Sequence, residues 1–214
     1  MNRTRETLAG TPIPLFLAAL VPPAVVLPLR LLAFGDGDPF TLVLLGPAAE
    51  EGLKLAALLL ALTLAGLWLP RGHDPANALR YWLFFAPWLV GGLYGMVEGI
   101  AIYPGQSTLD YTLREFAHGT FVALSLAEAL YVWRELDAPY VGVALGFGAG
   151  WAAHILFNEI AVLSAYADVT FLDQVVYTVV ALVLAAVALG RVVAREPASP
   201  TAERFLAVRG GLRT

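Results

Sequence analysis

The sequence of 214 residues contains no cysteine, which excludes disulfide bonds and cysteine-ligated metal sites. Charged residues are scarce as well: they make up 14% of the chain, against about a quarter of a soluble domain. No cluster of basic residues suggests a nucleic acid as a partner. Hydrophobic residues make up 59% of the chain, and the mean hydropathy is +0.72. This composition excludes a soluble globular domain and predicts an integral membrane protein.

The hydrophobic runs are long and do not alternate with polar residues, which favours membrane helices over a β-barrel. We expect an all-α, polytopic transmembrane bundle of about six helices, whose spans cover residues 12–34, 41–69, 80–103, 112–133, 139–163 and 171–193. The first run is longer than a signal-peptide core, so it is expected to remain in the protein. The spans form one domain, residues 12–194, between an N-terminal tail (1–11) and a flexible C-terminal tail (195–214).

The distribution of arginine predicts how the protein lies in the membrane. Six spans place both tails on one side, and most arginines fall in those tails and in the loops of that side. Acidic residues prevail in the other loops, where Arg114 is the main exception. The positive-inside rule therefore predicts a multi-pass protein of the cell membrane with both termini in the cytoplasm. The lipid bilayer is its first expected partner.

One charged segment interrupts the second expected span. Glu50, Glu51 and Lys54 lie within five residues of one another in an otherwise hydrophobic run. Each charge at the centre of a membrane helix costs about 2.5–3.5 kcal/mol unless it is paired or faces a polar cavity. Lys54 is three or four residues from the two glutamates, so it shares a helix face with them and can neutralise one. An ionisable cluster at such a place predicts a functional site.

Neighbouring spans carry further polar side chains at a similar depth. At about 1.5 Å per residue, Glu50 and His154 lie roughly 14 Å from the outer ends of their spans. Glu98 and His118 lie roughly 8–9 Å from theirs. Asn158 follows His154 by one helical turn and shares its face. Four spans are therefore expected to bring these groups together in the outer half of the membrane.

These residue types suit the attack of water on a carbonyl group. A carboxylate shielded from bulk water can act as a general base, while two imidazoles and a carboxamide can orient water or stabilise an oxyanion. Alternatively, His118, His154 and Glu50 form a three-ligand set for Zn²⁺ that leaves one position open for water. Both alternatives predict peptide hydrolysis inside the membrane, with a membrane-anchored protein as the substrate.

Four short motifs follow one another along residues 48–158: Glu50-Glu51-x-x-Lys54, a glycine- and aromatic-rich segment ending at Glu98, Arg114-x-x-x-His118 and His154-x-x-x-Asn158. In this order they resemble the PrsW-type intramembrane proteases. That family is similar to the wider superfamily of CAAX prenyl proteases and bacteriocin-processing enzymes. The resemblance covers four of the six expected spans and implies an intramembrane peptidase whose catalytic residues are Glu50, Glu51, His118, His154 and Asn158.

The resemblance also implies a role for each residue. Glu50 activates water, Glu51 pairs with Lys54, and the histidines and the asparagine position the water and the oxyanion or bind a metal. PrsW-like proteins are often described as metalloproteases, whereas the CAAX relatives look like glutamate proteases. The alternatives of a zinc ion and of no cofactor therefore both stay open.

Two further residues are expected to support the site. The family often has asparagine after the glutamate of the third span, and Gly99 stands there in this chain. Glu98 is therefore assigned a supporting role, as is Arg114, which lies one turn before His118. Intramembrane glutamate and histidine residues also serve proton- and ion-coupled transporters. A transporter is thus one alternative function, and a non-catalytic immunity or binding protein with a protease fold is another.

Overall fold

The computed structural model of the protein describes residues 13–33, 41–67, 75–136, 138–163 and 171–194. These ranges contain α2 (Ile13–Ala33), a π-helical turn η1 (Thr41–Leu45), α3 (Gly46–Leu67), α4 (Pro75–Ile102), α5 (Thr108–Leu136), α6 (Pro139–Leu163) and α7 (Phe171–Ala194). No strand occurs in them, so the all-α class is confirmed. The expected tails, residues 1–11 and 195–214, lie outside the described residues.

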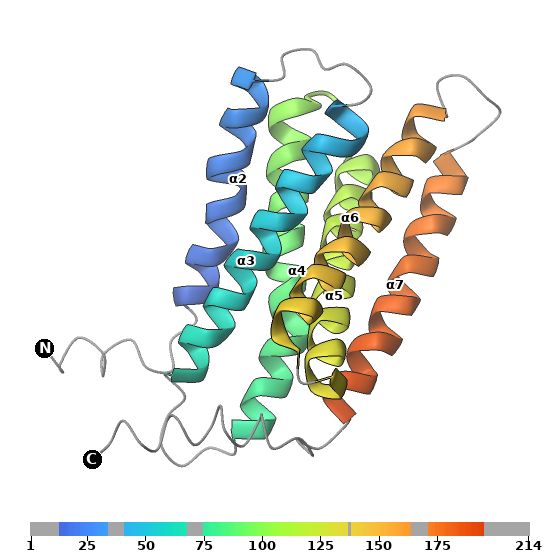
Figure 1. The fold of residues 1–214 in the computed structure, drawn as a ribbon. Helices are drawn as coiled ribbons and strands as arrows, with labels where there is room; N and C mark the ends of the chain where they lie inside the picture. The colour runs from blue at the N-terminus through green and yellow to red at the C-terminus, as the bar shows by residue number, and fades with distance from the viewer. Residues whose placement is uncertain (1–12, 34–40, 68–74, 137, 164–170, 195–214) are drawn as a thin grey trace, which may run out of the picture.

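The helices form one bundle in which successive helices run in opposite directions (Figure 1). α5 is the central helix, since it packs against α4, α6 and α7. α2 packs against α3 and α4 at the other side of the bundle. The α4–α5 and α5–α6 connections lie at opposite ends of the bundle (Figure 1). This arrangement allows α3, α4, α5 and α6 to present residues to one common interior.

Four of the described helices contain stretches long and hydrophobic enough to cross a membrane: Phe85–Ile102, Thr108–Trp133, Pro139–Ile160 and Leu172–Val192. The described part of α2 has a shorter hydrophobic stretch, Leu15–Leu29. α3 carries the three charges of the segment that begins at Glu50, which lower its hydropathy. The helices confirm a membrane protein with transmembrane spans.

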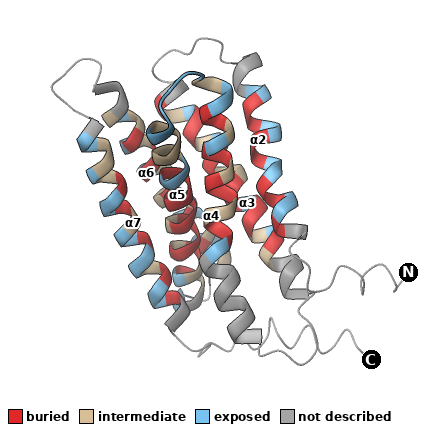
Figure 2. Ribbon diagram, turned by 180° about the vertical axis from the view of Figure 1, so that it is seen from behind, coloured by how far each residue is buried: buried red, intermediate tan, exposed pale blue. Residues whose placement is uncertain are grey.

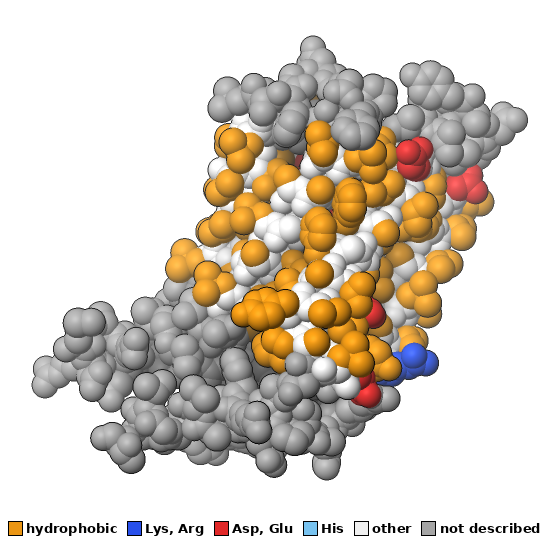
Figure 3. All heavy atoms as spheres, viewed as in Figure 1, with side chains coloured by type: hydrophobic (Ala, Val, Ile, Leu, Met, Phe, Trp, Pro, Cys, Tyr) orange, Lys and Arg blue, Asp and Glu red, His pale blue; other side chains and the backbone are white. Residues whose placement is uncertain are grey.

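The bundle exposes far more large hydrophobic side chains than a soluble protein does. Exposed residues line the outward faces of α2 and α7 (Figure 2), and hydrophobic side chains cover much of the described surface on the face shown in Figure 3. Phe16, Leu20, Val180 and Leu184 are each more than half exposed. The interior contains a hydrophobic core, and charged groups such as Glu50, Glu51 and Lys54 are buried beside it. This is the pattern of a protein whose surface contacts lipid.

Glycines bring α5 close to both of its neighbours. A Cβ atom at Gly91 of α4 would overlap the backbone carbonyl of His118 on α5, and one at Gly95 would come 2.8 Å from the His118 ring. On α6, a Cβ atom at Gly150 would overlap Ser125 of α5. Small residues allow membrane helices to approach in this way. The positions of the histidine-bearing helices thus depend on these glycines.

A buried candidate catalytic cluster

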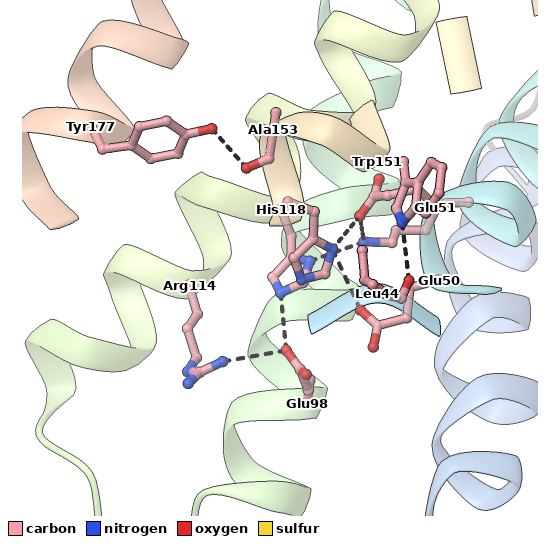
Figure 4. Close-up of polar contacts among 11 residues, drawn as sticks. Leu44, Glu50, Glu51, Glu98, Arg114, His118, Trp151, Ala153 and Tyr177 are labelled. Atoms are coloured by element: carbon pink, nitrogen blue, oxygen red, sulfur yellow. Dashed lines mark hydrogen bonds and ion pairs between the residues drawn. The ribbon is translucent and has the colours of Figure 1, made fainter. Parts of the chain in front are cut away.

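Six titratable side chains from four helices meet in the interior of the bundle (Figure 4). Each is at most 2% exposed to solvent. We call this group the polar cluster; it comprises Glu50, Glu51 and Lys54 from α3, Glu98 from α4, His118 from α5 and His154 from α6. The structure therefore brings together the polar groups whose common depth suggested a shared site.

Lys54 lies between α3 and α5 and contacts both. Its Nζ is 2.5 Å from Glu51 Oε1, which is the ion pair that the three-residue spacing predicts. The same Nζ is 2.9 Å from His118 Nδ1 and 4.4 Å from the centre of the Tyr94 ring. A carboxylate, an imidazole and an aromatic face thus surround the ammonium group. Its charge is balanced inside the bundle by the Glu51 carboxylate.

The partners of His118 assign its protons. An ammonium group only donates hydrogen bonds, so His118 Nδ1 accepts one from Lys54. In the neutral ring the proton is then on Nε2, which lies 2.9 Å from Glu98 Oε2 and donates to it. Both ring nitrogens are therefore engaged in this arrangement. His118 connects the α3 and α4 parts of the cluster.

His154 is held by the glutamate pair of α3. Its Nδ1 is 2.9 Å from Glu51 Oε1 and 3.8 Å from Glu50 Oε2. A carboxylate only accepts hydrogen bonds, so Nδ1 donates, and in the neutral ring the lone pair is on Nε2. Glu51 Oε1 thus accepts hydrogen bonds from both His154 and Lys54. Its other oxygen, Oε2, is buried and has no hydrogen-bond partner among the described residues.

Aromatic rings enclose the two histidines. The Phe121 ring stacks on His154 with centroids 5.0 Å apart, and His118 and His154 meet edge to face at 4.7 Å. Tyr94 covers His118 and Lys54 from α4. Such packing fixes the orientation of the rings and excludes water from around them. Sequence reasoning missed Tyr94 and Phe121, although they lie one turn from Glu98 and His118, respectively.

Arg114 lies at the edge of the cluster, with 15% of its side chain exposed. Its Nη1 is 3.5 Å from Glu98 Oε2, and its guanidinium group lies 3.8 Å from the centre of the Tyr103 ring. This position agrees with a supporting role for both Arg114 and Glu98. Asn158 lies one turn beyond His154 on α6 and is half-buried. Its participation in the site stays a prediction.

Four residues of the polar cluster have the composition of a metal-binding site. Ligand atoms of Glu50, Glu51, His118 and His154 all lie within 4.8 Å of one another, and this mixture of imidazole and carboxylate donors is one that Zn²⁺ uses. However, the Lys54 ammonium is in contact with Glu51 Oε1 and His118 Nδ1. A cation cannot use those lone pairs while the ammonium holds them. In this arrangement the cluster does not fit a metal bound through these two atoms.

Comparison of the chain with family models, with curated proteins and with solved structures gave no match. The function therefore has to be inferred from the polar cluster itself.

Proposed function

We propose that this protein is an intramembrane endopeptidase of the PrsW type that hydrolyses peptide bonds of membrane-anchored proteins. One observation carries the proposal: Glu50, Glu51, His118 and His154, from three helices, have ligand atoms within 4.8 Å of one another in the buried interior. One ion pair would be enough to hold a charged helix in a bundle. Two adjacent carboxylates with two imidazoles supply, in addition, a base and groups that orient water.

In this proposal Glu50 is the general base. Lys54 neutralises Glu51, so Glu51 serves to hold His154 rather than to accept a proton. With Nδ1 donating to Glu51, His154 offers its Nε2 lone pair to one hydrogen of a water molecule, and Glu50 accepts the other. A water molecule held by two acceptors presents its own lone pair to a carbonyl carbon. The proton accepted by Glu50 then passes to the leaving amine.

The remaining residues support this step. The carboxamide of Asn158 is the donor that we assign to the developing oxyanion. His118 has both nitrogens engaged with Lys54 and Glu98, so its role is to fix the position of Lys54 and hence of Glu51. The cluster is closed to solvent, which means that water and substrate reach it only when helices of the bundle separate.

The proposal is tested with a library of single-span helices reconstituted in liposomes with the purified protein. New peptide termini are identified by mass spectrometry. We expect cleavage by the wild type and a loss of rate of about 10²–10⁴-fold in Glu50→Gln, which is the usual contribution of a general base. Glu159→Gln is the matched control, because Glu159 is an exposed glutamate on α6. Equal cleavage by the wild type and Glu50→Gln would refute the proposal.

One observation favours a second candidate, a proton-coupled transporter. A continuous chain of polar contacts connects the half-buried Arg114 to the core, through Glu98, His118, Lys54, Glu51 and His154. Such chains of titratable groups relay protons in membrane pumps. Proton flux into liposomes that requires Glu50, without any cleavage of the helix library, would favour this candidate over hydrolysis.

A further inference from the structure

We infer that Lys54 takes the place of a metal ion in the polar cluster and excludes divalent cations from a donor set that could otherwise bind one. The inference concerns the same residues as the proposed function, but it does not require that the protein cleaves peptides. It rests on the surroundings of one ammonium group and on the identity of the atoms that it contacts.

The Lys54 ammonium is placed as a bound cation would be. The residue is 0% exposed, and its Nζ lies against Glu51 Oε1, His118 Nδ1 and the face of the Tyr94 ring. These three contacts come from three different helices, α3, α5 and α4. An ammonium group has three N–H donors and can satisfy three partners in this way. The lysine thus joins the helices around a central positive charge.

Two of the residues that the ammonium group contacts also belong to the potential metal-binding set. Glu51 and His118 are two of the four residues whose ligand atoms gather within 4.8 Å. Zn²⁺ binds such donors at about 2.0–2.2 Å. An ion bound through Glu51 Oε1 and His118 Nδ1 would therefore have to occupy the space next to them that Nζ occupies. Two cations at that separation would also repel each other strongly in the membrane interior. Lysine and metal are therefore alternatives at this position.

The lysine also determines which His118 nitrogen carries the proton and which one offers a lone pair. Because Nδ1 accepts from Lys54, Nε2 carries the proton and donates to Glu98 Oε2 at 2.9 Å. Without the ammonium group, Nδ1 would present its lone pair to the centre of the cluster, beside Glu51 Oε1. The Glu51 carboxylate would then lose the cation that this lysine supplies. Removal of the lysine charge should therefore create a site for Zn²⁺.

The test uses full-length protein purified in detergent and treated with chelator. Wild type, Lys54→Met, Lys54→Arg and the double variant Lys54→Met/His154→Ala are each incubated with Zn²⁺ or Co²⁺ alone. Bound zinc per chain is measured by elemental mass spectrometry, and cobalt coordination by visible absorption. Lys54→Arg is the matched control, because it keeps a cation at the position. The double variant removes one of the proposed ligands.

We expect Lys54→Met to bind one Zn²⁺ per chain and to show a cobalt absorption band, and we expect neither in the other three proteins. A folded Lys54→Met protein that stays free of metal would overturn the inference. So would a wild-type protein that holds one Zn²⁺ per chain and loses it in His118→Ala. If Lys54→Met does not fold, the wild type decides: a Tm that Zn²⁺ does not raise supports the inference, and a Tm that it raises overturns it.

Neither readout involves a substrate. A wild type that excludes metal but cleaves no helix would leave this inference standing while the proposed hydrolysis fails. A wild type that cleaves peptides and holds stoichiometric Zn²⁺ through His118 would support the proposed hydrolysis and overturn this inference.

Discussion

One carboxylate oxygen, Glu51 Oε1, receives hydrogen bonds from two donors, Lys54 Nζ and His154 Nδ1. This sharing distinguishes the two adjacent glutamates. Glu51 is tied to a cation and an imidazole, whereas Glu50 Oε2 lies 3.8 Å from the same imidazole. A carboxylate that already balances an ammonium group is a poor proton acceptor. The geometry therefore supports the assignment of Glu51 to positioning and of Glu50 to the transfer of protons.

The first prediction concerns the contribution of the Glu51–Lys54 pair to the free energy of unfolding. Both side chains are fully buried, so Lys54→Met leaves a carboxylate without its cation and is expected to lower the free energy of unfolding by about 3–5 kcal/mol. The double variant Glu51→Gln/Lys54→Met removes both charges and should recover part of that loss. Unfolding in detergent with chelator present measures both values. A single variant as stable as the wild type would contradict the prediction.

Among the elements, helix α6 agrees most closely with the sequence prediction: both place it at residues 139–163. α5 begins four residues earlier than predicted, at Thr108. The reason is a cap: the Ser107 backbone N–H donates to Asp110 Oδ2 at 3.0 Å, and the Asp110 N–H donates to Ser107 Oγ at 3.2 Å. This signal is present in the sequence, but it lies among polar residues where hydropathy gives no helix.

Other features of the elements were not accessible to sequence reasoning. The π-helical turn η1 precedes α3, and the Trp151 indole N–H of α6 donates to the Leu44 carbonyl within it at 3.0 Å. A contact between residues so far apart depends on how whole helices pack. The Glu51–Lys54 pair follows from local spacing, whereas the contact of Lys54 with His118 depends on the rotation of α3 relative to α5. The sequence thus indicates which groups meet, but not which atoms pair.

A prediction at the scale of elements concerns the approach of α4 to α5. Gly91→Ala adds a Cβ atom that overlaps the His118 carbonyl, so the two helices must separate where the histidine is held. We expect a loss of about 1–3 kcal/mol in the free energy of unfolding, typical of overpacking, together with a loss of any activity that depends on His118. Gly148→Ala on α6 is the control, since nothing lies within 4 Å of its added atom.

Thermal unfolding of both variants in the same detergent measures the difference. Equal Tm values for Gly91→Ala and Gly148→Ala would show that the close contact of α4 and α5 does not restrict the side chain at this position.

At the scale of the described bundle, many hydrophobic side chains face outward, and the polar cluster is buried inside. Each side chain of the polar cluster is at most 2% exposed, so the cluster is shielded from water. The proposed hydrolysis would therefore require a more open arrangement of the helices, favoured by the substrate or the bilayer.

The orientation in the membrane gives a prediction at this scale. The chain has no cysteine, so single cysteines can be introduced without a background. Ser107 and Glu135 are both exposed and lie at opposite ends of the bundle. If both termini are cytoplasmic, a membrane-impermeant maleimide labels Ser107→Cys in intact cells, but labels Glu135→Cys only after permeabilisation. The reverse pattern would show that the orientation predicted by the positive-inside rule is wrong.

The central claim is that the polar cluster hydrolyses peptide bonds. It is tested most directly by carrying out the helix-library reaction in water labelled with a heavy oxygen isotope. Hydrolysis puts one oxygen atom of water into the new carboxylate of each product. We predict that labelled product forms with the wild type and with Glu159→Gln, and that Glu50→Gln forms almost none. The account is contradicted if the wild type produces no labelled carboxylate, or if Glu50→Gln produces as much as the wild type.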